Sequence, residues 1–328
     1  MRKDFFRRSI RAALAPYALP AMRALVSRMT WDELQRLGGR LGRVGRRLAR
    51  RRTRITLANL EFVLSDELSQ ERRAAITTAA FESAARLGLE MLKLPSMTPA
   101  ELAEVAPIEG LEHLAAARDA GKGAVVVSAH LGNWEISAVR LIHEGYRVVA
   151  LSRASRSERI ARAITAVRRE LDFETIPVDE GIRPCLRLLR DNGILGIMPD
   201  RRARGQGVYV EFFGHRVNVW HTPILLGARA GAPVMPCHGL RQPDGTFIVR
   251  IGEPVELTAT GDRERDLQAN TQRLFDRLEA LIREHPGQYL WQYDMWREAQ
   301  LGYDPAAVKP GERPPPRGFR ERRPGGDE

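Results

Sequence analysis

The stretch GAVVVSAHLGNWEISAVRLIHEGYRVVAL (residues 123–151) decides the fold, because it passes from an apolar strand through a turn and a helix into a second strand. The strand AVVVS (124–128) ends just before His130, and Asn133 is suited to cap the helix that follows. The next β-branched run, YRVVAL (146–151), begins after one amphipathic segment. This order predicts a βαβ unit.

Later runs of the same kind extend the sheet. FETIPV (173–178) and ILGIMP (194–199) are separated by segments of helical period. The pair APVMPCHGLR (232–241) and GTFIVRIG (245–252) meets at a turn-forming Gln-Pro-Asp-Gly, which predicts a hairpin at one edge. We therefore predict an α/β fold with a mixed, largely parallel central sheet flanked by helices.

Helical spacing of apolar residues precedes the sheet and predicts an N-terminal helical cap. Residues 31–54 show this spacing, although several glycines weaken it, and a better helix begins at about Gln70. The Pro-, Gly- and Arg-rich tail is predicted to be disordered. The chain is predicted to divide into a basic N-terminal segment (1–54), a main domain (55–300) and this tail (301–328). The main domain consists of the helical cap (55–105) and the α/β body (106–300).

Positive charge is concentrated at the N-terminus. Residues 1–54 hold sixteen Lys or Arg against Asp4, Asp32 and Glu33, a net charge of +13 that leaves −2 for the rest of a chain with +11 in total. Attraction to a polyanion is therefore a property of this segment. Anionic lipid and nucleic acid are both candidate partners.

Residues 5–29 mix aromatic and aliphatic side chains with arginines. Their longest charge-free run, 12–22, is too short to cross the hydrocarbon core of a bilayer. We predict a membrane-surface anchor whose basic side chains face lipid headgroups, or alternatively a helix packed on the body.

Several familiar catalytic motifs are absent. The sequence has no GxSxG, complete Walker, CxxC or HExxH motif, which argues against a serine hydrolase, a nucleotide phosphotransferase and a zinc protease. Its histidines show no spacing typical of metal ligands, so neither a metal nor another cofactor is predicted. Cys185 and Cys237 lie in apolar patterns, and we expect them to pack in the core in a reducing compartment.

His130 and Glu135 are the residues best placed to do chemistry. Side chains at the carboxyl ends of strands in an open α/β sheet project into the crevice where ligands bind. Residues five apart on a continuous helix point about 140° away from each other, so this pair meets only across a bend, which Gly132 supplies. A carboxylate beside an imidazole orients it as a general base. We predict that Glu135 orients His130.

The block HLGNWE (130–135) resembles the HX4E signature of the lysophospholipid acyltransferase superfamily, with a closer likeness to the bacterial late acyltransferases of lipid A. Other blocks between residues 50 and 297 resemble the same family, and several spaced blocks are more specific than one motif. In order, they are RRTRITLANLEFVL (51–64), VRRELDFETIP (167–177), PDRRARGQGVYVEFFG (199–214), GARAGAPVMP (227–236) and HPGQYLWQYDMWR (285–297).

This resemblance implies an O-acyltransferase that moves a fatty acyl group from a thioester of acyl carrier protein or coenzyme A, as co-substrate, to a hydroxyl of a lipid A-type glycolipid precursor. An alternative acceptor is another glycolipid or a lysophospholipid, such as a mannosylated phosphoinositide. The likeness also implies a position on the anionic cytoplasmic face of the bacterial inner membrane, either peripheral or N-terminally anchored.

The same resemblance assigns roles residue by residue. His130 would be the general base and Glu135 its orienting acid. Arg168 would bind a phosphate or the developing oxyanion, and Asp200 would position His130, the acceptor or a neighbouring arginine. The predicted substrate-binding set is Asn133, Arg168, Asp200, Arg201 and Arg202.

Two departures from the family pattern leave the acceptor open. Arg201 stands where the family usually has Gln or His, and residues 219–222 replace a run rich in Thr and Gly. The extra arginines, Arg201 and Arg202 among them, either clamp phosphates or a carboxylated sugar, or form a solvated loop.

Two other functional classes compete with this interpretation. A nucleic-acid-binding protein would explain the basic segment, but it leaves HLGNWE without a role, and an aromatic content of 6% offers little base stacking. We therefore predict no nucleic-acid partner. The second competitor is an inactive lipid carrier on the same fold.

Overall fold

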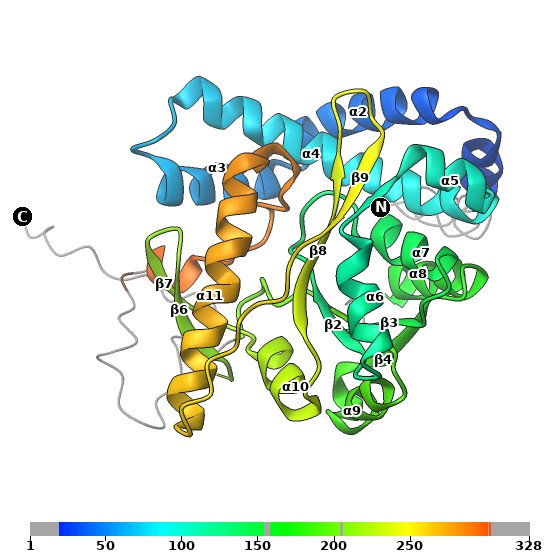
Figure 1. Cartoon of the computed structure of the whole chain (residues 1–328). Coiled ribbons are helices and arrows are strands. Elements are labelled where there is room, and N and C mark those ends of the chain that lie inside the picture. Colours follow the sequence, from blue (N-terminus) through cyan, green and yellow to red (C-terminus); the bar gives the residue numbers. More distant parts are fainter. Residues whose placement is uncertain (1–19, 154–157, 204–205, 301, 303–328) are drawn as a thin grey trace, which may run out of the picture.

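A seven-stranded sheet lies at the centre of the computed structural model, which describes residues 20–153, 158–203, 206–300 and 302. Its strand order is β1-β9-β8-β2-β5-β3-β4, and all neighbouring pairs are parallel except β8 with β9 (Figure 1). This confirms the predicted mixed, largely parallel sheet. The strands are β1 Ile108–Glu109, β2 Ala124–Val127, β3 Val148–Ser152, β4 Glu174–Pro177, β5 Ile194–Ile197, β8 Val234–Arg241 and β9 Phe247–Ile251.

Helices cover both faces of the sheet because successive strand residues point to opposite sides. Val125 and Val127 of β2 share a core with α9 (Arg183–Arg190), α10 (Thr222–Ala230) and α11 (Arg263–Glu284). Ala124 and Val126 of the same strand share another core with α6 (Leu111–Asp119), α7 (Trp134–His143) and α8 (Glu158–Glu170). The short helices are η1 Leu94–Ser96, α5 Pro99–Val105, η2 Val178–Glu180, η3 Pro286–Gln288 and α12 Arg297–Gln300.

The helical cap consists of α2 (Trp31–Leu48), α3 (Arg50–Leu64) and α4 (Gln70–Lys93), which run along the top of the molecule in Figure 1. Glycines let α2 approach α4 closely, since a Cβ at Gly42 would lie 2.3 Å from the Cα of Glu82. Three of the glycines that weaken the helical pattern, Gly38, Gly39 and Gly42, are therefore required by this packing, whereas a Cβ at Gly45 would meet nothing within 4 Å. The boundary predicted at residue 54 falls inside α3, and α2 packs on the body.

Two features of the strands differ from expectation. β8 and β9 form the predicted hairpin, but it does not lie at the sheet edge, because β1 pairs with the outer side of β9 and places Ile108 opposite Val249. Residues 208–219 form a separate antiparallel hairpin, β6 (Val208–Phe212) with β7 (His215–Val219), that the sequence analysis did not predict.

The described residues include no helix that is long and apolar enough to cross a membrane. Residues 20–28 are helical. Most of the predicted anchor at 5–29 and of the predicted disordered tail at 301–328 lies outside the described residues. Cys185 and Cys237 are buried free thiols, as predicted.

Candidate active site

His130 and Asp200 meet because they follow neighbouring parallel strands at the same height. β2 and β5 pair so that Val127 lies opposite Ile197, and each functional residue stands three positions beyond this pair. The Nδ1 of His130 lies 2.7 Å from Oδ1 of Asp200, and the backbone N–H of His130 donates to Oδ2 at 2.8 Å. Both oxygens of one carboxylate therefore hold one histidine.

The protonation of this pair follows from its contacts. Burial alone would raise the pKa of Asp200, but the charge and hydrogen bonds of His130, with the charge of Arg201, outweigh it and lower the pKa. An ionised carboxylate only accepts hydrogen bonds, so Nδ1 carries the proton and Nε2 presents its lone pair. Nε2 has no hydrogen-bond partner among the described residues and is not one of their fully buried, unpartnered atoms. It is accessible to a proton donor.

Two aromatic rings enclose His130 without sealing it. Trp134 and Tyr293 lie edge-on to the imidazole, with centroid distances of 5.2 and 5.5 Å. The imidazole side chain retains 7% of its surface in solvent. The surroundings of the imidazole are therefore nearly dry, and a charge-assisted contact there is stronger than in water.

Glu135 does not orient His130, so that prediction was wrong. Its carboxylate accepts hydrogen bonds from Nε and Nη2 of Arg168 at 3.0 and 2.5 Å. It also accepts from the indole N–H of Trp134 at 3.1 Å, and in the described part of the chain no hydrogen bond joins it to His130. The carboxylate that holds His130 is instead that of Asp200, which the register of β2 with β5 places beside it. Glu135 contacts Trp134, whose ring lies edge-on to the imidazole.

Arg168 is correspondingly committed to Glu135. Its side chain is buried, and its guanidinium lies 4.8 Å from the centroid of the Phe173 ring. These contacts argue against the predicted role in binding a phosphate or oxyanion. The buried pair instead joins the start of α7 to the end of α8, beside the strand tips.

Asn133 is a structural residue. Its side-chain oxygen caps α7 by accepting from the N–H of Ile136 at 3.0 Å, as the sequence predicts. Its amide nitrogen donates to Glu90 at 2.8 Å, and Asn133 itself is fully buried. An amide that is enclosed in this way offers a substrate no surface, which argues against the predicted substrate contact.

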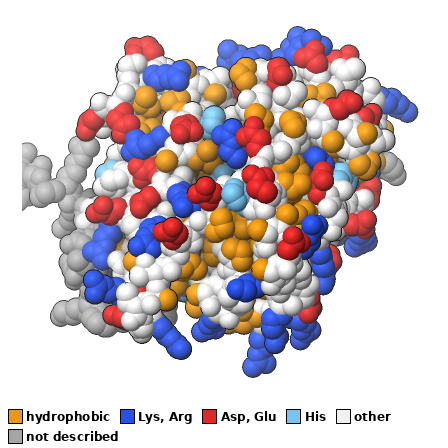
Figure 2. Space-filling view, in the orientation of Figure 1, with side chains coloured by type: hydrophobic (Ala, Val, Ile, Leu, Met, Phe, Trp, Pro, Cys, Tyr) orange, Lys and Arg blue, Asp and Glu red, His pale blue; other side chains and the backbone are white. Residues whose placement is uncertain are grey.

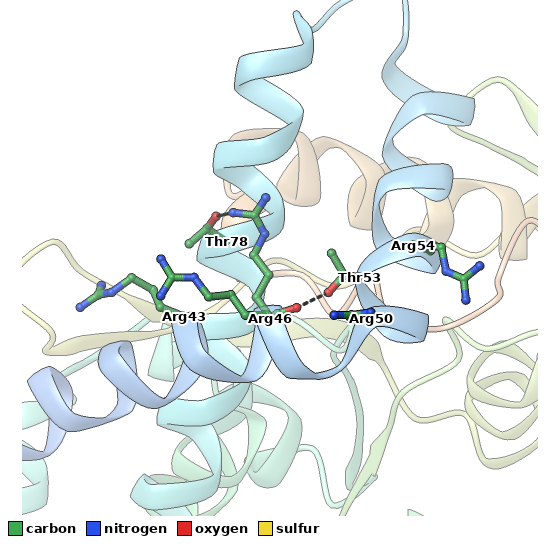
Figure 3. Close-up of a pocket in the computed structure, with 7 residues that line it drawn as sticks. Arg43, Arg46, Arg50, Thr53, Arg54 and Thr78 are labelled. Atoms are coloured by element: carbon green, nitrogen blue, oxygen red, sulfur yellow. Dashed lines mark hydrogen bonds between the residues drawn. The ribbon is translucent and has the colours of Figure 1, made fainter.

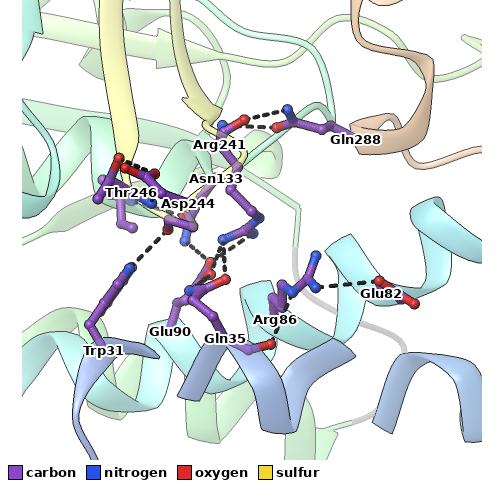
Figure 4. Close-up of polar contacts among 12 residues, drawn as sticks. Trp31, Gln35, Glu82, Arg86, Glu90, Asn133, Arg241, Asp244, Thr246 and Gln288 are labelled. Atoms are coloured by element: carbon purple, nitrogen blue, oxygen red, sulfur yellow. Dashed lines mark hydrogen bonds and ion pairs between the residues drawn. The ribbon is translucent and has the colours of Figure 1, made fainter. Parts of the chain in front are cut away.

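Glu90 is the centre of a buried polar cluster that ties the cap to the catalytic turn (Figure 4). Glu90 lies on α4 and accepts hydrogen bonds from three side chains. The donors are Asn133, Gln35 of α2 at 2.6 Å, and Arg241 of β8. With so many donors its buried charge is compensated, as burial requires. The helical cap therefore holds the turn that carries His130.

The bend after His130 depends on Gly132, as predicted. Its φ is +61°, and a Cβ there would lie 2.0 Å from the carbonyl oxygen of Gly239. The backbone of this turn is pinned from two sides, since Asn133 N–H donates to Gly239 O and Leu290 N–H donates to His130 O, both at 2.9 Å. Only glycine fits both the conformation and the space.

The two predicted arginines behave differently. Arg201 is exposed, its guanidinium lies 3.9 Å from the centroid of the Tyr293 ring, and it donates to the Tyr293 hydroxyl. Arg202 points inward and pairs with Glu298 at 3.0 Å. Arg201 therefore lies at the surface beside Tyr293, whose ring contacts His130, whereas Arg202 holds the C-terminal helix α12.

A family model described as bacterial lipid A biosynthesis acyltransferase matches residues 6–298. The chain belongs to this family. It is an acyltransferase, as the resemblance implies. It is 31% identical to a phosphatidylinositol mannoside acyltransferase of Mycolicibacterium smegmatis. The alignment spans 235 residues, which is 68% of this chain and 75% of that relative. A protein of the same name from Mycobacterium tuberculosis is 30% identical over 237 residues, 68% and 73% of the two chains. A lipid A biosynthesis acyltransferase of Haemophilus influenzae is 22% identical over 274 residues, 82% and 83% of the two chains.

Three residues that the sequence analysis did not assign to the site of this acyltransferase surround the histidine and aspartate. Burial and the Asp200 carboxylate raise the pKa of Tyr289 well above its usual value, so its hydroxyl stays protonated. His238 of β8 lies 3.2 Å from Ser128 Oγ, and burial lowers its pKa to about 4. Tyr293 is the third. Both tyrosines lie in the family-like block 285–297, but the sequence assigned them no role, and the tertiary contacts show that they lie beside His130 and Asp200.

The described residues of the acyltransferase contain no group of three His, Cys, Asp or Glu side chains arranged to hold a metal ion. The chemistry that this site offers is that of an imidazole base. A buried anion keeps one nitrogen protonated, so the other is ready to accept a proton from a hydroxyl.

Proposed function

We propose that Nε2 of His130 removes the proton from an acceptor hydroxyl as its oxygen attacks the acyl thioester carbonyl. An ester C–O bond forms, the C–S bond breaks, and the imidazolium returns its proton to the departing thiolate. Asp200 keeps Nδ1 protonated and stabilises the imidazolium while it exists. The observation that carries this proposal is the 2.7 Å contact between Nδ1 and Oδ1, with Nε2 left accessible.

The proposed acyl donor is a thioester of acyl carrier protein or coenzyme A. The proposed acceptor is a mannosylated phosphoinositide, which we favour because the 31% and 30% identical relatives carry a matching name. A lipid A-type precursor is the second candidate, supported by the family model and the 22% identical relative. Exposed Arg201 is the proposed contact for an acceptor phosphate, since a guanidinium fork suits phosphate oxygens.

We further propose that the enzyme works at the cytoplasmic face of the inner membrane. The excess of basic residues in 1–54 supports attraction to anionic lipid.

The test is acyl transfer in isolated membranes, with lipid products followed by mass spectrometry, which reports acceptor and acyl mass together. Replacing His130 with Ala is expected to lower turnover by at least about 10²-fold, the usual contribution of a general base. The matched control is His113→Ala, a partly exposed histidine of α6. Near wild-type turnover in the His130 variant would exclude the proposed mechanism.

The acceptor is tested separately, by supplying purified enzyme with either a mannosylated phosphoinositide or a lipid A precursor. We expect a product mass increase only on the former. Transfer to the lipid A precursor alone would reverse the order of the two candidates while leaving the chemistry intact.

A further inference from the structure

Arg153 lies at the same edge of the sheet as the candidate base. It follows β3 directly, and the register of β3 with β5 places Ala150 opposite Gly196. Arg153 stands three positions beyond the first of these residues, and Asp200 stands four positions beyond the second. The carboxyl ends of parallel strands meet at one edge of a sheet, where ligands bind. Arg153, Asp200 and His130 therefore follow three neighbouring strand ends, in the order β3, β5 and β2.

Trp220 reaches this edge from β7. Arg202 and Val219 form an antiparallel bridge. One further step along each chain of an antiparallel pair places Trp220 beside Arg201, the residue that follows Asp200. The tryptophan is half-buried, so part of its surface stays open to solvent beside the candidate site.

Trp220 and Arg153 contact each other across this edge. The guanidinium carbon of Arg153 lies 5.7 Å from the centroid of the indole ring, within the range of a cation–π contact. Arg153 is exposed, and no carboxylate among the described residues forms a salt bridge with it. We call these two residues the tryptophan–arginine pair. The pair presents an aromatic surface and an unneutralised positive charge next to the strand ends that carry the base and its acid.

A second group of arginines lies in the helical cap and lines a cavity of about 830 Å³ where α2, α3 and α4 meet (Figure 3). Figure 2 shows basic side chains over α2 along the top of the molecule. Within the described chain, no residue from a strand end lines this cavity. The cavity therefore offers a bound ligand no contact with the strand ends, unlike the tryptophan–arginine pair. The cavity is lined by Arg43, Arg46, Arg47, Arg50, Thr53, Arg54 and Thr78.

A phosphorylated sugar has the chemistry that the tryptophan–arginine pair recognises. The C–H groups on one face of a pyranose ring carry partial positive charge and pack on the electron-rich face of an indole. A guanidinium fork binds the oxygens of a phosphate. We propose that the pair holds the sugar ring of a phosphorylated glycolipid acceptor, with the ring on Trp220 and a phosphate at Arg153. This inference rests on the proposed function, because the sugar is then the group that carries or adjoins the attacking hydroxyl.

Two other ligands of such a reaction fit the pair less well. The glycerol backbone of a lysophospholipid carries phosphate but has no rigid ring face for Trp220. Coenzyme A has both a ring and phosphates, but its adenine lies at the opposite end of the pantetheine arm from the thioester. A general base acts within about 2.6–3.2 Å of the hydroxyl that it deprotonates, so the group beside His130 is the one that bears this hydroxyl. A ring on Trp220 therefore belongs to the acceptor.

The aromatic contact is tested by acceptor kinetics with purified enzyme, a mannosylated phosphatidylinositol and palmitoyl coenzyme A. Trp220→Leu keeps an apolar side chain but removes the flat ring. We expect it to raise the KM for the acceptor about tenfold, since an aromatic stacking contact contributes on that order. Trp220→Phe retains a ring and should recover most of this loss, and neither variant should change the KM for the donor. An unchanged KM for the acceptor in Trp220→Leu, or a rise only in the KM for the donor, would overturn the proposal.

The phosphate contact is tested by Arg153→Gln, which should raise the KM for the acceptor about tenfold by removing a charge-assisted contact. The matched control is Arg187→Gln, which removes the same charge from an exposed position on α9. Equal rises in both variants would reduce the effect to net charge and refute the contact. Because Arg153 is exposed, its replacement tests the pair even if thermal unfolding shows that Trp220→Leu does not fold.

Binding is also measured without turnover, by titration calorimetry on the His130→Ala protein. The probes are the soluble head group mannosyl glycerophosphoinositol and glycerophosphoglycerol, which keeps a phosphodiester but has no ring. We expect the first to bind about tenfold more tightly, and Trp220→Leu to abolish the difference. A preference that depends on Trp220, without any acyl transfer by wild-type enzyme, would contradict the proposed function and leave this inference standing. Acyl transfer without that preference would do the reverse.

Discussion

The carboxylate that holds His130 belongs to Asp200, 70 residues further along the chain, and the two side chains meet at 2.7 Å. Their meeting follows from strand register, since β2 and β5 are parallel neighbours whose ends are level. Glu135, five positions from His130, makes its ion pair with Arg168 instead. The general base and its orienting acid therefore come from two different crossover units of the sheet.

Asp200→Asn should retain the shape of the site and lose its charge. Because an amide can donate to Nδ1, it favours the wrong imidazole tautomer, and we expect kcat to fall by about 10²–10⁴. Release of free thiol from the acyl thioester measures this. The exposed Asp179 of η2 provides the control Asp179→Asn, which should leave kcat unchanged. Equal rates for both variants would refute the orienting role.

Glu135→Gln is expected to destabilise the protein, since it leaves the buried Arg168 cation without its anion. Removing one partner of a buried ion pair costs on the order of 3 kcal/mol in the free energy of unfolding. The double variant Glu135→Gln/Arg168→Gln should lose less than the sum of the single variants. Urea unfolding of the four proteins completes the cycle, and strict additivity would show that the pair is uncoupled.

His238 should make stability depend on pH in the acid range. Its pKa is about 4 in the folded protein, below the unfolded value of 6.5, so the unfolded chain binds the extra proton first. The contribution of neutral, buried His238 to the free energy of unfolding is complete above pH 6.5 and is lost as the pH falls toward 4. Between pH 7.5 and 5 this amounts to roughly 2 kcal/mol. His238→Gln should flatten that part of the curve, and an unchanged slope would disprove the assignment.

Gly132→Ala should disrupt the catalytic turn, whereas Gly121→Ala is a matched control. Both glycines have positive φ, at +61° and +66°, so each substitution costs about 1–2 kcal/mol of backbone strain. Only at Gly132 would the new Cβ also meet backbone, 2.0 Å from Gly239 O, while nothing lies within 4 Å of the other. We expect kcat to drop sharply in the first variant alone, and a similar kcat in both would count against the pinned turn.

Gly42→Ala and Gly45→Ala test the close packing of α2 on α4. A Cβ at Gly42 would lie 2.3 Å from the backbone of Glu82, so overpacking should cost roughly 1–3 kcal/mol or more. At Gly45 nothing lies within 4 Å, and alanine should stabilise the helix by up to about 1 kcal/mol. Thermal unfolding should move Tm in opposite directions, and shifts of the same sign would contradict the packing seen here.

Local pattern was sufficient for much of this molecule. The β-branched runs at 124–128 and 194–199, the helix from Gln70 and the cap at Asn133 were all predicted, because alternation, helical period and capping are short-range properties. The hairpin at 208–219 was not predicted, although Val208–Phe212 and His215–Val219 alternate apolar and polar residues, because this stretch was interpreted only as a family-like block. The glycines of α2 were interpreted as weakening the helix. The contacts that require Gly38, Gly39 and Gly42 are made with α4, which the local pattern of α2 does not contain.

By itself, the sequence determined that this chain forms an α/β sheet with His130 at a strand tip, followed by a glycine bend, since those features depend on neighbours in the chain. The family resemblance gave positioning of His130 as one of three possible roles for Asp200, and only the tertiary structure decided which carboxylate reaches the imidazole. Strand order and register bring Asp200 to His130 and leave Glu135 to Arg168. Such contacts depend on which strands lie side by side, and spacing along a single chain does not contain that information.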